Sequence, residues 1–261
     1  MERDRAVRAA ELLRDARTGM RRLDSLPEDV RPKTIDDGYR IQDELVALLG
    51  ARVAGWKLGS TSKQAQAIVG TTEPFGARLL APNVLDSPAT LSARSLFMRA
   101  VESEFAFKLA EDLPPGRAPY GRDDVVARVA SLHPAIEVSD SRYTDWSKVG
   151  APSLIADNGN DGKFVLGAGI THWRPIDLAR HTVALAVNGR TVSQGTGAAV
   201  LGDPVLALVW LANDRARRGG GLEAGQVITT GSCTGVYLAQ AGDHVRADFG
   251  GMGVVDLNFE S

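Results

Sequence analysis

From residue 51 onward, the chain consists of short β-rich runs that glycine and proline separate from one another. Four such runs follow in succession at the end of the chain, at residues 226–230, 235–239, 243–249 and 253–259. Glycine-containing turns join them, which is typical of strands that pair with a neighbour in the sequence. The regular alternation of strand and helix that marks a doubly wound fold is missing. The pattern therefore predicts an α+β protein with a mixed or antiparallel sheet.

Helical patterns precede the β-rich part. Alanine and leucine recur at helical spacing over residues 3–20, which predicts an amphipathic helix with a weakly apolar face. A second helix is expected to begin at Thr34, because two acidic residues and then apolar residues at helical spacing follow this hydroxyl. We therefore expect a helical N-terminal region over residues 1–50 and a mixed-β domain, which would hold an active site, over residues 51–261.

Two further helices are expected within the β-rich part. The stronger one has Asp203 as its N-cap and Pro204 at its first position, and it ends in arginines and three glycines. A smaller helix is expected over residues 122–132.

Composition limits the possible partners and location. A formal net charge of -2 provides no field that would attract nucleic acid or an anionic membrane surface, so we expect neither partner. The first residues are too charged for a signal peptide, and no apolar run is long enough to span a membrane. A single cysteine, Cys233, excludes an internal disulfide. These features together lead us to place the chain in the cytoplasm. No dinucleotide fingerprint or P-loop is present, so we expect no nucleotide cofactor.

Three glutamates form a candidate metal site. On a strand around residues 101–109, alternation directs Glu102 and Glu104 to the same face. Glu137 stands in a second apolar run, where an acid is unfavourable unless it is paired or is a ligand. Carboxylates alone suit Mg²⁺ or Mn²⁺ better than zinc, which prefers nitrogen and sulfur. The alternative is an exposed strand face on which two glutamates are close by chance.

Other polar residues are candidates for substrate binding or proton transfer. Lys57, between an aromatic and an aliphatic residue, is either a desolvated acid-base group or a surface lysine on an edge strand. Asp157 and Asn158 belong to a polar loop that either forms a tight turn or lines the substrate site. Ser232 and Thr234 lie in a hydroxyl-bearing loop of the kind found near ligands, but Ser232 does not fit a nucleophile elbow.

Several segments in a specific order resemble the hydratase and decarboxylase branch of the fumarylacetoacetate hydrolase superfamily. The likeness begins near residue 35 and continues to the end of the chain. The motifs that carry it are Gly55-Trp-Lys-Leu-Gly-Ser-Thr-Ser, Val101-Glu-Ser-Glu-Phe-Ala-Phe, Pro134-Ala-Ile-Glu-Val-Ser-Asp-Ser-Arg-Tyr-Thr-Asp-Trp, Ala156-Asp-Asn, Gly197-Ala-Ala-Val-Leu-Gly-Asp-Pro, Val209-Trp-Leu-Ala-Asn and Gly242-Asp-His-Val-Arg-Ala-Asp-Phe-Gly-Gly-Met-Gly. Each motif is weak alone, whereas their order and spacing are specific.

This resemblance implies a fold, a site and a reaction. The fold would be the mixed β-sandwich or β-roll of the superfamily, preceded by helices, in a homo-oligomer. The family's metal motif falls on Glu102, Glu104 and Glu137, and its active-site lysine falls on Lys57. The implied chemistry is Mg²⁺-dependent (or Mn²⁺-dependent) addition of water to a small 2-hydroxy-2,4-dienoate, an intermediate of aromatic compound catabolism, which gives a 4-hydroxy-2-oxo acid.

One segment departs from the family pattern. Relatives often carry an aspartate directly before the Phe-Gly that follows the lysine motif, whereas this chain has Thr71-Thr-Glu-Pro-Phe-Gly. Glu73 is the candidate replacement as acid-base partner of Lys57. The departure leaves three alternatives to the hydratase open: a 2-oxo acid decarboxylase of the 4-oxalocrotonate type, a hydrolase of acylpyruvates, or a non-catalytic partner subunit. The absence of a convincing His-Glu pair to activate water makes the hydrolase the weakest of these.

Overall fold

A computed structural model describes residues 1–261, and its strands form two mixed sheets. The larger sheet has the order β2-β1-β10-β5-β6-β7-β3, with β11 paired to β5, and the smaller sheet has the order β4-β13-β12-β8-β9. The larger sheet contains β1 (Val53–Gly59), β2 (Phe75–Leu80), β3 (Val84–Asp86), β5 (Ala100–Leu109), β6 (Val129–Ser139), β7 (Lys163–Leu166), β10 (Val227–Ser232) and β11 (Tyr237–Leu238). The smaller sheet contains β4 (Ala89–Ser92), β8 (Thr182–Val187), β9 (Arg190–Thr196), β12 (His244–Asp248) and β13 (Val254–Glu260). The predicted α+β class with mixed sheets is confirmed.

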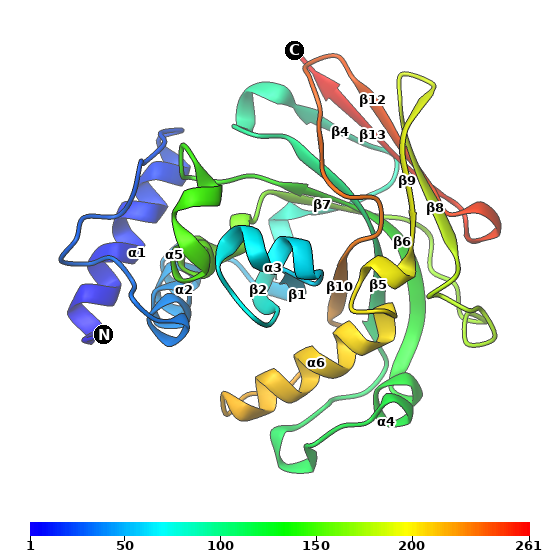
Figure 1. Cartoon of the computed structure of the whole chain (residues 1–261), viewed down its shortest axis with the longest axis horizontal. Coiled ribbons are helices and arrows are strands. Elements are labelled where there is room, and N and C mark those ends of the chain that lie inside the picture. The colour runs from blue at the N-terminus through cyan, green and yellow to red at the C-terminus, as the bar shows by residue number, and fades with distance from the viewer.

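The chain also forms six α-helices, which lie to the left of and below the strands β8 and β9 of the smaller sheet in the view of Figure 1. They are α1 (Arg3–Thr18), α2 (Ile35–Leu49), α3 (Lys63–Val69), α4 (Arg122–Ala127), α5 (Gly150–Ala156) and α6 (Pro204–Arg217). Thr34 caps α2, since its hydroxyl accepts a hydrogen bond from the Asp37 N–H at 3.1 Å. Asp203 caps α6 in the same way through the Val205 N–H at 2.8 Å. Both predicted helix starts are confirmed, and no helix has the length and apolar character needed to cross a membrane.

The helix expected over residues 122–132 is shorter than predicted. It ends at Ala127, and β6 begins at Val129. Residues 129–132 pair with β5, where Val129 lies opposite Leu109 and Leu132 lies opposite Phe107. The prediction was wrong here because pairing and burial in the sheet override a local helical pattern.

The strand β5 separates the main hydrophobic core from the site. Phe105 and Phe107 are fully buried on one face of β5, among apolar residues of the smaller sheet. The Phe105 ring contacts Phe249 edge to face at a centroid distance of 5.2 Å. Because side chains alternate along a strand, Glu102 and Glu104 point away from this core. The apolar packing of one face therefore fixes where the carboxylates of the other face point.

A second core joins the N-terminal helices to a later part of the chain. Leu13 of α1 and Leu45 of α2 are fully buried and belong to one cluster with Leu154 of α5 and Phe75 of β2. In Figure 1, α1, α2 and α5 lie together on the side of the molecule opposite β8 and β9. The division into residues 1–50 and 51–261 stays a prediction.

Candidate metal and active site

Three carboxylates meet on the face of β5 and β6 that is turned away from the main core. Glu102 lies directly opposite Glu137 in the antiparallel register, and Glu104 follows on the same face of β5. One oxygen from each of the three lies within 4.8 Å of the others. The structure thus brings together the three glutamates that were predicted as ligands.

The burial of these carboxylates is unfavourable without a cation. Burial and the charge of Glu137 raise the pKa of Glu102 to about 8. Burial, followed by the charges of Glu137 and Glu102, also raises the pKa of Glu104 well above its ordinary value. The Oε1 atom of Glu104 has no hydrogen-bond partner. Clustered carboxylate oxygens with an unpartnered buried atom fit a hard divalent cation, which would favour the ionised forms.

One glycine of β10 completes the surroundings of Glu104. The Gly231 N–H donates a hydrogen bond to Glu104 Oε2 at 2.9 Å. Gly231 has a φ of 107°, and a β-carbon at this position would lie 2.0 Å from Thr61 Oγ1. A side chain cannot be accommodated here, so the close approach of this backbone to the carboxylate depends on glycine.

Lys57 is the cation of the site. Its side chain projects from β1, is 3% exposed as a residue, and forms an ion pair with Glu137. Its Nζ also donates to the carbonyl oxygen of Gly159 at 2.7 Å. Burial by itself would lower the pKa of Lys57, but the negative charges of the three carboxylates, Glu137 above all, outweigh burial and raise it. Without a metal, Lys57 is therefore a charged ammonium group and not a free base.

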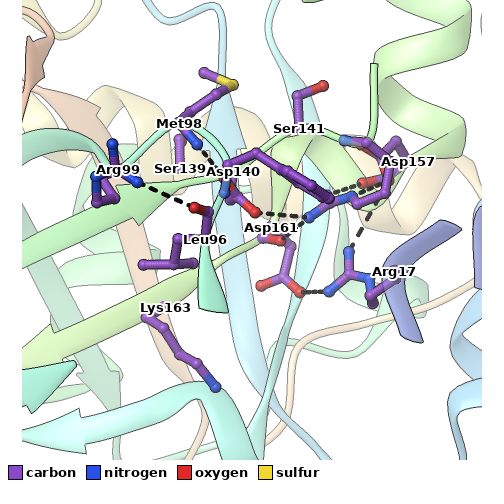
Figure 2. A network of polar contacts seen from close by, with 12 residues as sticks. Arg17, Leu96, Met98, Arg99, Ser139, Asp140, Ser141, Asp157, Asp161 and Lys163 are labelled. Atoms are coloured by element: carbon purple, nitrogen blue, oxygen red, sulfur yellow. Dashed lines mark hydrogen bonds and ion pairs between the residues drawn. The ribbon is translucent and has the colours of Figure 1, made fainter. Parts of the chain in front are cut away.

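The loop that presents Gly159 is held by a buried polar network (Figure 2). Asp157 is fully buried, and its Oδ1 accepts from the Arg142 Nε at 2.7 Å. Arg17 of α1 donates to Asp161 at 2.9 Å. Asn158 bonds both the N–H and the carbonyl of Arg78, at 2.8 and 2.9 Å. Asp157 and Asn158, predicted to bind substrate, lie outside the cavity lining and instead hold the loop in place.

The loop itself has an unusual backbone. Asn158, Gly159 and Asn160 have positive φ angles of 51°, 64° and 58°. Such conformations are unfavourable for residues with side chains and persist where surrounding contacts impose them, often at functional sites. They direct the Gly159 carbonyl toward Lys57. The buried Oδ1 of Asn160, a cavity-lining residue, is left without a hydrogen-bond partner.

Glu73 does not reach the site. Its side chain is about half exposed and lies 3.7 Å from Arg217, outside the cavity lining. Thr71 Oγ1 donates to the Glu73 carbonyl at 3.0 Å, which closes a turn before β2. The turn leaves Glu73 on the surface and buries Phe75 at the cavity instead. The structure therefore does not support Glu73 as the acid-base partner of Lys57.

The two hydroxyl residues of the 231–235 loop have different positions. Ser232 lines the cavity, and its Oγ donates to the Gly235 carbonyl at 2.9 Å. Thr234 lies outside the lining, and its Oγ1 accepts from the Ser103 N–H at 3.4 Å. Of this pair, only Ser232 is placed to contact a substrate.

Sequence reasoning missed Ser139 and Asn160. The Ser139 Oγ donates to Glu137 Oε1 at 2.6 Å and lines the cavity. Because Ser139 stands two residues after Glu137, strand alternation places both on one face and could have identified it. The position of Asn160 follows from three successive left-handed residues, for which the sequence pattern contains no comparable signal.

These groups open into one cavity of about 600 Å³. Its polar lining residues are Lys57, Ser60, Thr61, Ser62, Gln64, Glu102, Ser139, Asn160 and Ser232. Its larger apolar lining residues are Leu58, Ile68, Val69, Phe75, Met98, Trp146, Leu154 and Val236. A buried cluster of carboxylates with a lysine at the end of an apolar cavity is suited to bind a small organic acid together with a divalent cation.

Two mixed sheets, the larger of which carries a carboxylate cluster on the face turned away from the main core, define a class of β-rich proteins with an acidic site. A family model described as "Fumarylacetoacetate (FAA) hydrolase C-terminal" matches residues 89–259, which is more than half of the chain. The chain therefore belongs to the fumarylacetoacetate hydrolase family, as the sequence motifs predicted.

Named relatives resemble nearly the whole chain. A 2-hydroxyhexa-2,4-dienoate hydratase of Comamonas testosteroni is 36% identical, with 97% of this chain and 95% of that protein covered. A 2-keto-4-pentenoate hydratase of Paraburkholderia xenovorans is 32% identical, with 97% and 94% covered. A solved 4-oxalocrotonate decarboxylase from Pseudomonas putida G7, complexed with magnesium and adipate, superposes with a TM-score of 0.92 at 28% identity over 99% and 98% of the two chains.

Proposed function

We propose that this protein is a hydro-lyase that adds water to a small 2-hydroxy-2,4-dienoate and yields a 4-hydroxy-2-oxo acid. The single observation that carries the proposal is the convergence of Lys57 with Glu102, Glu104 and Glu137 beside one cavity, which Lys57 and Glu102 line. The full-length likeness to two proteins named as dienoate or pentenoate hydratases supports the choice of reaction.

The three glutamates would hold the metal, for which we propose Mg²⁺ or Mn²⁺. The magnesium in the solved decarboxylase supports this choice. When bound, the cation supplies Lewis-acid polarisation of the carboxylate and 2-oxygen of the substrate. The backbone N–H of Gly231 orients Glu104, and the Ser139 hydroxyl orients Glu137. Both contacts keep the oxygens in place in the free enzyme.

Lys57 is the group that we assign to proton transfer. Hydration requires loss of the 2-hydroxyl proton, a proton at C5, hydroxide at C4 and a proton at C3. Apart from Glu102, Lys57 is the only titratable side chain that lines the cavity. Its Nζ is held between Glu137 and the Gly159 carbonyl, so it can donate a proton and be restored by the adjacent carboxylate.

The decarboxylase is the second candidate, because a 4-oxalocrotonate decarboxylase of a Pseudomonas species is 32% identical over 86% of this chain and 87% of that protein. A dienoate assay separates the two. The hydratase consumes the dienol ultraviolet absorbance and forms a 4-hydroxy-2-oxo acid, whereas release of carbon dioxide from 4-oxalocrotonate without dienoate hydration would show a decarboxylase. Turnover of neither substrate with either metal would support a non-catalytic subunit.

A matched pair of variants tests the assignment of Lys57. We expect Lys57→Met to lower kcat for dienoate hydration by on the order of 100-fold or more, as loss of a general acid-base group does. Lys108→Met changes the same residue type at an exposed position on β5 that lies outside the cavity, and it should retain activity. Equal activity of both variants would remove Lys57 from the reaction.

The proposal also includes a homo-oligomer located in the cytoplasm. Leu238 on β11, 58% exposed, and Val236, a cavity-lining residue that is 57% exposed, supply an apolar surface that association of subunits would cover. The one cysteine is buried and unpaired, which is compatible with a reducing compartment.

A further inference from the structure

One wall of the cavity is apolar, and it begins beside the polar groups. A β-carbon placed on Gly159 would lie 3.2 Å from the Phe75 ring and 4.0 Å from Lys57 Nζ. Phe75 therefore adjoins the lysine. Val69, Phe75 and Leu154 belong to one buried cluster, and Trp146 packs against that cluster. The lining thus continues from the lysine along a connected apolar surface.

This wall ends at an apolar residue that is open to solvent. Ile68 on α3 lines the cavity and is 47% exposed, and Val236, 57% exposed, is the other large apolar lining residue that is exposed. Val69, the neighbour of Ile68, also lines the cavity but is buried. An isolated exposed isoleucine is ordinary, but one at the open end of an apolar cavity is positioned to cover a ligand.

The cavity contains no second positive charge. Lys57 is the only lysine or arginine in its lining, no histidine lines it, and the Lys57 ammonium is already paired with Glu137. Two lysines lie nearby in sequence but are engaged elsewhere. Lys63 Nζ donates to Gln66 Oε1 at 3.2 Å, and Lys148 pairs with Asp145 at 2.7 Å. A carboxylate at the far end of a substrate would exchange part of its hydration for uncharged groups only, because the polar lining residues nearest to Ile68 in the sequence are Ser60, Thr61, Ser62 and Gln64.

The cavity volume also exceeds what a five-carbon acid needs. At about 600 Å³ it falls within the range of roughly 300–1,000 Å³ that is usual for pockets that enclose drug-sized ligands. We infer that the substrate carries an uncharged apolar tail beyond C5, which lies along Phe75, Leu154 and Trp146 and ends at Ile68. The inference rests on the proposed function for the reacting end of the substrate. It also disfavours dicarboxylates such as 4-oxalocrotonate as substrates.

Binding of unreactive 2-oxo acids tests this inference without turnover. Calorimetry in the presence of Mg²⁺ would compare pyruvate, 2-oxopentanoate, 2-oxohexanoate and 2-oxoadipate. The last two have the same backbone length and differ in a terminal methyl or carboxylate. We expect affinity to rise about threefold to fourfold per added methylene. We expect 2-oxoadipate to bind at least about 10-fold more weakly than 2-oxohexanoate.

A charge introduced at the end of the wall provides the second measurement. Ile68→Arg should bring 2-oxoadipate to at least the affinity of 2-oxohexanoate. Leu206→Arg places the same charge on α6, at a residue of similar exposure (43%) outside the cavity, and should leave the selectivity unchanged. If Ile68→Arg does not fold, the affinities of the unaltered protein for 2-oxohexanoate and 2-oxoadipate decide whether the tail is apolar.

The outcomes for the tail and for the reaction are distinct. Affinity that does not rise with chain length, 2-oxoadipate binding as tight as that of 2-oxohexanoate, or no binding of any 2-oxo acid would overturn the tail assignment. The expected binding order together with no dienoate hydration would retain the apolar tail and reject the hydratase. Hydration of dienoates with no preference for alkyl tails would retain the hydratase and reject the tail.

Discussion

At the scale of single residues, Glu104 combines full burial, an unpartnered oxygen and a raised pKa. Glu104→Gln keeps the shape but removes a charge that only a cation offsets. We expect it to weaken Mg²⁺ binding on the order of 100-fold, because loss of a partner that merely orients a ligand already costs about 10- to 100-fold. The metal-free variant should be at least as stable to denaturant as the unaltered protein, since one buried like charge is gone.

Glu73→Gln is the matched control, since it makes the same change at a surface carboxylate outside the cavity. Its Mg²⁺ affinity, measured by calorimetry, should equal that of the unaltered protein. Unchanged metal affinity in Glu104→Gln, or a large loss in Glu73→Gln, would contradict the site described above.

At the scale of elements, Arg142 connects the end of β6 to α5 and to the loop that carries Gly159. Its guanidinium is buried, bonds Asp157, and donates to the Asp161 carbonyl at 2.8 Å. Arg142→Met would leave the buried Asp157 with Arg17, at 4.0 Å, as its remaining cationic partner. We expect a loss of about 3 to 5 kcal/mol in the free energy of unfolding, as is typical when one member of a buried ion pair is removed.

A double-mutant cycle in denaturant separates this pairing from simple loss of packing. Asp157→Asn combined with Arg142→Met should recover part of the lost stability, because the buried charge of Asp157 is then removed as well. Strictly additive losses would mean that the ion pair does not couple these elements.

At the scale of the whole molecule, the site links metal binding to stability and pH. The pKa of Glu102 is raised to about 8 by burial and by Glu137, compared with about 4.3 for an unfolded glutamate. The metal-free fold is thus favoured below about pH 4.3 by this group, and it loses that contribution as pH rises through about 8. A bound divalent cation requires the ionised form of Glu102, so the stability that the cation adds increases as pH rises.

We therefore expect Mg²⁺ at about 100 times its Kd to raise Tm by about 5 to 10 °C near pH 8. The increment should shrink as pH falls below about 8, because protonated Glu102 competes with the metal. Thermal melts at several pH values, with EDTA as the metal-free reference, measure it. A Tm increment that is constant from pH 6 to 9 would argue against Glu102 as a ligand.

Local patterns in the sequence determined much of the framework. Alternation placed Glu102 and Glu104 on one face of β5, and short side chains at Thr34 and Asp203 marked two helix starts. These features depend on neighbours within a few residues, which the sequence displays directly. The family motifs added the fold and the expected metal ligands, since their order along the chain is preserved.

Only the tertiary structure decided how distant segments meet. The β5–β6 register sets Glu137 opposite Glu102, and the same pairing converts residues 129–132 from expected helix to strand. The fold leaves Glu73 on the surface, assigns Asp157 to Arg142, and brings Asn160 into the cavity. Such outcomes depend on long-range pairing and burial, whose free energies exceed local preferences, so the chain pattern alone could not assign them.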